Sequence, residues 1–271
     1  MTTTSGDLAA FVPQALARVR AQHPLVQCLT NTVVADFTAN VLYAVGSTPA
    51  MVDVPDEAGA FAGIASAIVI NLATPHAEQR TAVVEAAQAA DSAGKPWVLD
   101  AFTVGALPVR TALAHELVQL RPTVVRGTAP EIIAIAGTGA GGQGTDASAE
   151  NLAAAQESAR TLARSISGVV ALSGTATFVT DGTRESRITN ADGLLAQVAG
   201  GAGGALAAMM SAFAAVDEDR LATTVAAVAV YKVAAEIAAQ QATRPGSFAV
   251  AFLDALASLT EHDLLERTAL S

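Results

Sequence analysis

The sequence predicts an α/β fold: a three-layer α/β/α sandwich whose mostly parallel sheet carries an antiparallel hairpin at one edge. Three observations support this. Short apolar runs alternate with longer Ala-rich segments, which is typical of a parallel sheet covered by helices on both faces. One later segment instead alternates apolar and polar residues around Asp181-Gly182, a strong hairpin signal. Hydrophobic residues make up 52% of the chain but aromatic residues only 4%, so small aliphatic side chains must build the core.

The expected strands and helices follow one another in a regular βα order from residue 66. Each expected strand is a short apolar run, and each helix between them is a longer segment rich in alanine. The strands are Ser66–Leu72, Trp97–Asp100, Thr123–Gly127 and Gly168–Gly174; the helices are His76–Ala93, Val109–Leu120 and Ser148–Ser167. The hairpin is expected over Ala176–Thr189, and only helices are expected after it. No linker divides the chain, so we expect a single domain over residues 1–271.

The charge of the chain excludes some partners. A formal net charge of -10 and a pI near 4.8 argue against a nucleic-acid surface, which needs a basic patch. Leu194–Val216 has no charged residue, but glycine and alanine fill its first half, so a buried helix is expected and no membrane association. Cys28 is the only cysteine, which precludes an intramolecular disulfide and fits a cytoplasmic protein.

Two glycine-rich stretches invite a phosphate-binding interpretation. In QVAGGAGGALAAM, four of the residues at 200–204 are glycine and an Ala-rich helix follows. Such a helix start is either an anion site, because its backbone N–H groups are accessible, or only a tight turn. The second stretch, Gly137–Gly144, matches a dinucleotide pattern, but a helix rather than a strand precedes it. We expect a surface loop there.

Polar residues stand at the ends of successive expected strands. They are Asp100, Arg126 and Ser173, with Asn71 as a fourth candidate, and Glu131 follows at the start of a short helix. Ligands gather at the carboxyl ends of parallel strands. Carboxylates there can hold magnesium and an arginine can neutralise phosphate oxygens, which predicts a phosphoryl-transfer site. Each residue alone also has an ordinary structural explanation, as a helix cap, an ion pair or a turn residue.

Longer segments make a family recognisable. They are Pro24–Asp53, Gly94–Thr111, Leu120–Ile132, Val179–Asn190, Gly200–Val216 and Arg244–Leu256. In these segments, which run nearly end to end, the chain resembles hydroxyethylthiazole kinases, the thiamine-salvage enzymes of the ribokinase-like fold. The resemblance implies transfer of the ATP γ-phosphate to the primary alcohol of 4-methyl-5-(2-hydroxyethyl)thiazole, with Mg²⁺ as cofactor. It also implies a homotrimer with sites at subunit boundaries.

The resemblance also assigns residues. It implies that Met51 and Gly201 contact the thiazole, and that Arg126 and Ser173 contact the nucleotide. Asp100 and Glu131 would serve the magnesium and phosphate end. Thr128, which stands where the family has asparagine, is grouped with the nucleotide residues.

The glycine stretch departs from the family pattern. The family usually has Gly-Thr-Gly-Cys at this helix start, whereas this chain has Gly201-Ala202-Gly203-Gly204. The backbone N–H groups of Gly203 and Gly204 remain as an anion hole, but the side-chain base is absent, so we expect a slow or substrate-shifted kinase. Two alternatives stay open: a non-catalytic protein that binds nucleotide or thiazole, and an ATP- or ADP-dependent dehydratase of hydrated NAD(P)H.

Overall fold

The computed structural model, which describes residues 5–137, 149–191, 193–198 and 202–271, contains one eight-stranded sheet in the order β2-β1-β3-β4-β5-β6-β7-β8. Neighbouring strands from β2 to β6 pair in parallel, and the β6–β7 and β7–β8 pairs are antiparallel. The strands are β1 Leu25–Leu29, β2 Thr48–Ala50, β3 Ala67–Asn71, β4 Trp97–Asp100, β5 Val124–Gly127, β6 Val169–Leu172, β7 Thr177–Thr180 and β8 Glu185–Ile188.

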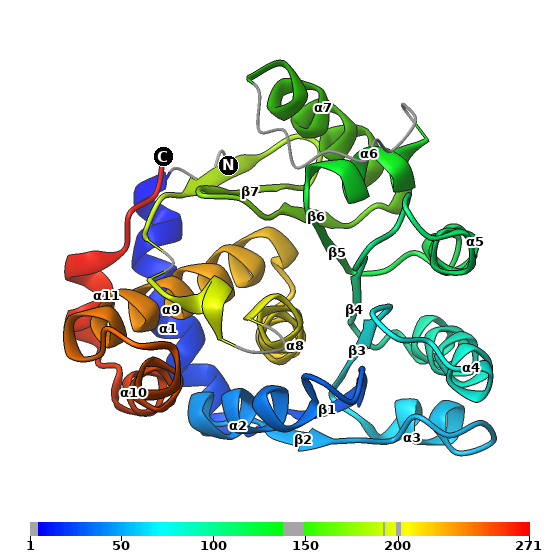
Figure 1. Cartoon of the computed structure of the whole chain (residues 1–271), viewed down its shortest axis with the longest axis horizontal. Coiled ribbons are helices and arrows are strands. Elements are labelled where there is room, and N and C mark those ends of the chain that lie inside the picture. Colours follow the sequence, from blue (N-terminus) through cyan, green and yellow to red (C-terminus); the bar gives the residue numbers. More distant parts are fainter. Residues whose placement is uncertain (1–4, 138–148, 192, 199–201) are drawn as a thin grey trace.

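Helices cover both faces of this sheet. They are α1 Ser5–Gln22, α2 Ala35–Val45, α3 Ala58–Ile64, α4 Ala77–Ala93, α5 Pro108–Val118, α6 Ala129–Ala136, α7 Ala149–Ile166, the 3₁₀ turn η1 Leu195–Gln197, α8 Ala202–Ala214, α9 Arg220–Gln241, α10 Pro245–Ser258 and α11 Glu261–Arg267. In Figure 1 the strands form an arc that half encloses α8, while α3 to α7 lie on the outer side of the arc.

The fold class predicted from the sequence is confirmed. The four expected strands appear as β3, β4, β5 and β6, and the expected helices as α4, α5 and α7, each within two residues of the predicted bounds. Around Asp181-Gly182 the hairpin β7–β8 forms at the sheet edge, where Gly182 takes a φ of 91°. Only helical elements follow β8 among the described residues, apart from a bridge between Ile188 and Leu270. The dinucleotide-like stretch falls mostly at 138–148, outside the described residues.

Successive residues of each central strand point to opposite faces of the sheet, and both faces are apolar. In β4, Val98 packs in the cluster formed with α1, α2 and α8–α11, whereas Trp97 and Leu99 pack in the cluster formed with α3–α7. Because both faces are buried, these strands are continuously apolar rather than alternating. The exceptions are the polar residues at the strand ends. They mark the edge of the sheet, where the apolar core ends.

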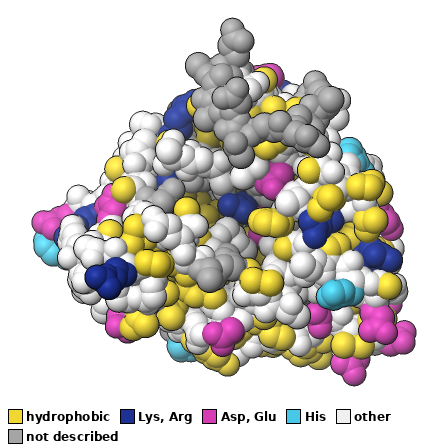
Figure 2. Space-filling model, viewed as in Figure 1, with side chains coloured by type: hydrophobic (Ala, Val, Ile, Leu, Met, Phe, Trp, Pro, Cys, Tyr) yellow, Lys and Arg dark blue, Asp and Glu magenta, His cyan; other side chains and the backbone are white. Residues whose placement is uncertain are grey.

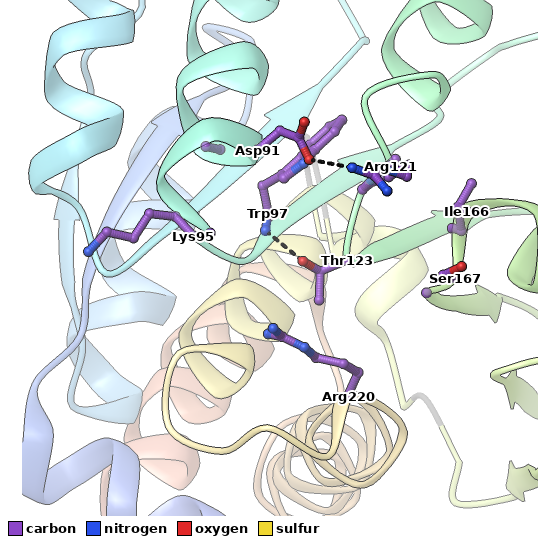
Figure 3. A pocket seen from close by; sticks show the side chains of 12 residues that line it. Asp91, Lys95, Trp97, Arg121, Thr123, Ile166, Ser167 and Arg220 are labelled. Carbon is purple, nitrogen blue, oxygen red and sulfur yellow. Dashed lines mark hydrogen bonds and ion pairs between the residues drawn. The ribbon is translucent and has the colours of Figure 1, made fainter.

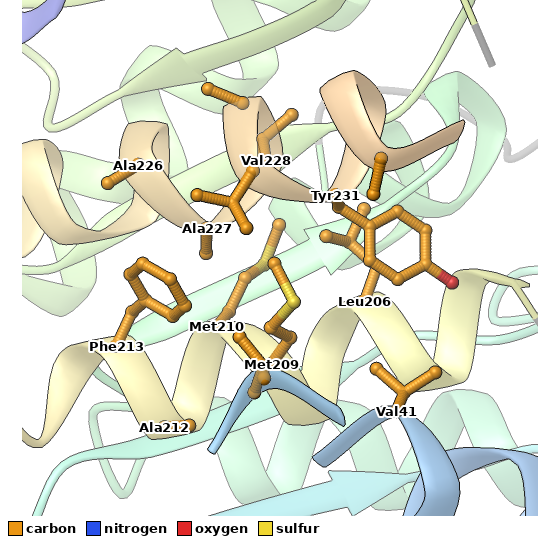
Figure 4. Packing of buried hydrophobic residues seen from close by; sticks show 14 of the residues in the cluster. Val41, Leu206, Met209, Met210, Ala212, Phe213, Ala226, Ala227, Val228 and Tyr231 are labelled. Carbon is orange, nitrogen blue, oxygen red and sulfur yellow. The ribbon is translucent and has the colours of Figure 1, made fainter. Parts of the chain in front are cut away.

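Helix α8 lies at the centre of the larger apolar cluster. Figure 4 shows Leu206, Met209, Met210 and Phe213 of this helix packed against Val41 of α2 and residues of α9. From Ala205 to Ala214 every residue of α8 is buried. The predicted buried helix within Leu194–Val216 is therefore confirmed. Helix α9 is long and apolar enough to cross a membrane by length and composition, but 89% of that window is buried inside the fold, as in a core helix.

Candidate active site

The strand-end residues predicted from the sequence meet at the carboxyl edge of the sheet. The register places Asn71 of β3 beside Asp100 of β4, and Asp100 beside Arg126 of β5. Ser173 directly follows β6 and its backbone N–H donates to the carbonyl oxygen of Gly127, 2.8 Å away. The parallel register alone therefore brings these four side chains into one line.

Arg126 and Asp100 form a buried ion pair. Arg126 Nη1 donates to Asp100 Oδ1 at 3.0 Å, and Arg126 Nε donates to Ser173 Oγ at 2.9 Å. The Asp100 side chain is fully buried and that of Arg126 is 11% exposed. Burial lowers the pKa of Arg126, but the charge and hydrogen bond of Asp100, with a smaller contribution from Glu131, outweigh it and raise the pKa above its usual value. The guanidinium is therefore a fixed positive charge.

The amino end of α8 faces this guanidinium. The helix begins at Ala202, and the guanidinium of Arg126 lies against the backbone of Gly203, leaving no room for a side chain there. Helix amino ends carry partial positive charge and unpaired N–H groups. A guanidinium and a helix amino end are both positively charged and repel each other unless an anion lies between or beside them. The negative charge of Asp100 offsets only one of these two positive charges. The arrangement favours a phosphate at this point.

Two cavities meet at Arg126. The larger, about 450 Å³, is lined by Asn31, Val33, Val34, Asn71, Phe102, Glu131 and Gly204 among others. The smaller, about 310 Å³, extends past Ser173 to Thr177, Tyr231 and Lys232. Both are bounded by Arg126, Thr128, Leu195, Ala196, Ala202 and Gly203. Figure 2 shows this face hollowed near its centre, where basic and acidic side chains lie among hydrophobic ones.

Glu131 holds two backbone segments. Its Oε2 accepts from the N–H of Thr128 and its Oε1 from the N–H of Thr103, each at 2.7 Å. The first bond caps α6, and the second holds the segment after β4, where Thr103 has a φ of 59°. That segment carries Phe102, which is 46% exposed and lines the larger cavity. Glu131 itself is 8% exposed and also lines this cavity.

Magnesium prefers oxygen ligands and keeps several waters. Glu131 lines the larger cavity, where water could bridge it to the ion, although both its oxygens already accept backbone N–H groups. Asp100 does not line either cavity, and both its oxygens already accept hydrogen bonds. Among the residues that the structure describes, no group of three or more His, Cys, Asp or Glu side chains could hold a metal ion. The metal role of Asp100 and Glu131 stays a prediction.

Of the two predicted thiazole residues, only Met51 is described by the structure. Met51 follows the edge strand β2, is 42% exposed and lines neither cavity. Gly201 lies outside the described residues. Cys28 is buried in β1, as the sequence suggested, and burial raises the pKa of its thiol to about 12.

Sequence reasoning missed Asn31, Phe102 and Lys232. Lys232 is 2% exposed, and its Nζ donates to the carbonyl oxygens of Thr175 and Asn190 at 3.0 and 3.1 Å. A single lysine in the middle of the apolar helix α9 was the available signal, since lysine is rarely buried without a purpose. Asn31 had no comparable signal, because its partner Asn71 lies 40 residues along the chain, and nothing in the sequence marked the exposed Phe102 either.

Another hollow, about 240 Å³, opens at the opposite edge of the sheet (Figure 3). Trp97, the first residue of β4, lines it, as do Arg121, which lies shortly after the end of α5, and Ser167, which directly follows α7. Helix carboxyl ends carry partial negative charge and disfavour phosphate. Of the basic side chains there, Arg121 pairs with Asp91. The helix carboxyl ends make this hollow less suited to phosphate than the cavities at Arg126.

Comparisons with known proteins identify similar sequences and structures. The model of the hydroxyethylthiazole kinase family matches residues 16–262. A hydroxyethylthiazole kinase of Clavibacter sepedonicus is 57% identical over 259 residues, covering 96% of this chain and 91% of that protein. The structure of a hydroxyethylthiazole kinase protein from Pyrococcus horikoshii OT3 has a TM-score of 0.87 at 34% identity and covers 96% of this chain and 98% of that one.

A more distant structure shares the fold alone. The ADP/ATP-dependent NAD(P)H-hydrate dehydratase from Bacillus subtilis, co-crystallised with ATP and Mg²⁺, has a TM-score of 0.58 at 16% identity and covers 94% of this chain and 96% of that one. Identity this low carries no argument for dehydratase activity. The resemblance found in the sequence is the one that the comparisons bear out.

Proposed function

The chain belongs to the hydroxyethylthiazole kinase family and is a phosphotransferase with an alcohol acceptor; from this we propose that it moves the γ-phosphoryl group of ATP to the primary alcohol of 4-methyl-5-(2-hydroxyethyl)thiazole. The observation that carries the proposal is the contact between Arg126 and the amino end of α8. Phosphoryl transfer needs chiefly positioning and electrostatic stabilisation of the moving group. A fixed guanidinium beside the N–H groups at the start of α8 supplies both.

The two cavities suit the two substrates. The smaller one, with Ser173 and the buried Lys232, suits the nucleotide, whose phosphates would reach Arg126 and Thr128. The larger one joins the apolar Val34 and Phe102 to the amide of Asn31, which suits a small heterocyclic alcohol. Met51 and Gly201 stay with the thiazole as the family implies. The γ-phosphate would then lie where the cavities meet, beside Gly203 and Gly204.

Magnesium would be held beside Glu131, through water and the phosphate oxygens. When bound, the ion neutralises charge on the β- and γ-phosphates. In this chain Arg126 would bind the transferring phosphoryl group, and the N–H groups of Gly203 and Gly204 would donate hydrogen bonds to its oxygens. The alcohol oxygen forms the new bond to phosphorus as the bond to ADP breaks, and the alcohol proton passes to solvent or to the transferred group.

Catalysis is proposed to be slow because Gly204 has no side chain to take that proton. General-base assistance contributes typically 10²- to 10⁴-fold. A β-carbon at Gly204 would meet Asn71 Nδ2 and Val34 Cγ2 at 3.4 Å, which is ordinary contact, so packing alone does not require glycine here. Glycine also leaves the larger cavity wider by one side chain, which would admit a bulkier acceptor.

The test is turnover with a matched pair of arginine variants. Incubation with ATP, Mg²⁺ and the thiazole alcohol should give ADP and phosphorylated thiazole. Arg126→Gln is expected to lower kcat/KM about 100-fold or more, because it removes the charge facing the phosphate. Arg126→Lys keeps a positive charge opposite the buried Asp100, so it replaces Arg126→Gln in this test if the glutamine variant folds poorly. The control is Arg121→Gln, an exposed arginine in the hollow at the opposite edge, which should stay within twofold of wild type.

A non-catalytic binder remains the second candidate, since Ala202, Gly204 and Thr128 all depart from the family pattern. Calorimetry distinguishes the two: tight nucleotide binding with no turnover on a panel of small alcohols favours the binder. Full activity of both Arg126 variants would instead contradict the proposed site.

The homotrimer stays a proposal that the surface supports. Several exposed large apolar side chains fall within residues 33–64, the stretch that contains the edge strand β2, namely Val33, Tyr43, Met51, Val54 and Ile64. Large exposed apolar patches mark association sites. Light scattering should give three times the chain mass of 27.2 kDa.

The cytoplasmic location likewise stays a prediction.

A further inference from the structure

Five side chains cross the carboxyl ends of five neighbouring strands as one hydrogen-bonded row. Asn31 Nδ2 donates to Asn71 Oδ1 at 3.0 Å, and Asn71 Nδ2 donates to Asp100 Oδ2 at 2.6 Å. Asp100 then pairs with Arg126, which donates to Ser173. We call these five residues the strand-tip row. It extends from the larger cavity at Asn31 to the smaller one at Ser173.

The orientation of the Asn71 amide is fixed within this row. Its Oδ1 accepts two hydrogen bonds, from Asn31 Nδ2 and from the backbone N–H of Ala73 at 2.9 Å. Only the Nδ2 atom can then face Asp100, because a reversed amide would lose both donors and oppose oxygen to oxygen. Asn71 is 3% exposed, so solvent barely competes for these bonds.

Asp100 depends on Asn71 for one of its two oxygens. Asn71 donates to Oδ2, Arg126 donates to Oδ1, and the residue is fully buried. Water therefore cannot replace a lost donor without a change in structure. An unsatisfied buried carboxylate oxygen is costly, so the carboxylate would turn toward other donors once Asn71 no longer binds it. Arg126 would then lose the partner that sets its place beside Gly203.

We propose that Asn71 is a positioning residue for phosphoryl transfer: it orients Asp100, and Asp100 in turn holds the Arg126 guanidinium at the amino end of α8. The inference rests on the proposed function, because it gives Arg126 the phosphate. It assigns Asp100 a part through Arg126 rather than through direct contact with a substrate. It also explains why an amide stands at the end of β3, where the rest of the strand is apolar.

A double-mutant cycle tests whether Asn71 acts through Asp100. Asn71→Leu keeps the side-chain size and removes the donor; it should raise KM for ATP about tenfold. Asp100→Asn should lower kcat/KM for ATP at least as much. If Asn71 acts through Asp100, Asn71→Leu combined with Asp100→Asn should be no more than twofold worse than Asp100→Asn alone. Asn71→Ser, whose hydroxyl is too short to reach Asp100, replaces Asn71→Leu if that variant does not fold.

Gln27→Leu is the matched control. Gln27 is a fully buried amide of β1 that donates to the carbonyl oxygens of Val52 and Ala58, away from Arg126. It should cost stability without changing KM for ATP. Purely additive losses in the cycle, or an equal ATP effect of Gln27→Leu, would overturn the inference.

Binding of ADP and Mg²⁺, measured by calorimetry on the same proteins, separates this inference from the proposed function. Wild type that binds ADP but never phosphorylates the thiazole alcohol would contradict the proposed function alone. A weaker ADP affinity of Asn71→Leu, absent in Gln27→Leu, would still support the positioning role. Equal ADP affinity in both variants would overturn it.

Discussion

Gly203 and Arg126 are in direct contact: a β-carbon on Gly203 would lie 2.6 Å from Nη1 and 2.8 Å from Nη2 of the guanidinium. Distances this short are repulsive, so the arginine reaches its observed place only because residue 203 has no side chain. The glycine is therefore needed for where the charge lies, not for a special backbone conformation.

Gly203→Ala should impair the enzyme while sparing the fold. The new methyl group meets the far end of a long side chain, which can move aside, so the free energy of unfolding should change by about 1 kcal/mol or less. The displaced guanidinium should lower kcat/KM for ATP about 100-fold, as misplacement of a positioning group does. Steady-state kinetics and thermal unfolding measure the two effects.

Gly204→Ala is the control for this variant, because its β-carbon finds no contact closer than 3.4 Å. Its kcat/KM should stay within about threefold of wild type. Equal losses in the two alanine variants would show that helix propensity or flexibility, rather than the Arg126 contact, explains the glycine.

Gly204→Cys should raise turnover. The β-carbon fits beside Asn71 and Val34, and a cysteine restores the family residue at this helix start. We expect kcat to rise about tenfold or more, within the range of general-base assistance. Rates of thiazole phosphate formation at saturating ATP measure it. An unchanged kcat would remove the explanation of slow catalysis by a missing base.

Tyr231→Phe should loosen the start of α8. The phenol hydroxyl donates to the carbonyl oxygen of Ala202 at 2.8 Å and ties the first turn of α8 to α9. Its loss should cost about 1 kcal/mol of stability and raise KM for ATP severalfold. Tyr43→Phe, at an exposed site on α2, is the control and should change neither quantity. A pure loss of stability without a change in KM would refute the link to the site.

Cys28 should make stability depend on pH. Burial raises the pKa of its thiol from 9.0 to about 12, so the unfolded chain ionises first as the pH rises. The stabilisation is complete below pH 9 and is lost above it at about 1.4 kcal/mol per pH unit, until the native thiol also ionises. Urea unfolding at pH 8 and pH 10 should therefore show wild type losing about 1.4 kcal/mol more than Cys28→Ala. Parallel losses would contradict the buried, protonated thiol.

Much of the fold could be predicted because its central strands are short apolar runs with clear ends. Trp97–Asp100 matches β4 residue for residue, since Pro96 precedes it and a polar residue closes it. The three-residue strand β2 and helices α2 and α3 were not predicted. A strand this short shows no periodicity, and pairing with β1 alone defines it.

The site could be predicted as a set of strand ends but not as a network. The sequence singled out Asp100 and Arg126, yet it did not determine that they pair with each other. It also offered Glu131 as a metal residue, which stays a prediction, and it did not indicate that both oxygens of Glu131 accept backbone N–H groups. The Asp100–Arg126 pair and the bond from Thr103 to Glu131 join residues 26 and 28 apart, and local patterns do not encode such contacts.

Helix α8 serves two roles that constrain each other. From Ala205 onward its side chains are all buried, so it cannot slide or tilt without disturbing the interior. Its first turn is therefore held in a fixed position. Substrates must bind against it, and any conformational change during a catalytic cycle has to occur in the chain segments around it. Adapting this scaffold to a new alcohol would accordingly require changes in the residues that line the cavities around α8, while the helix itself stays in place.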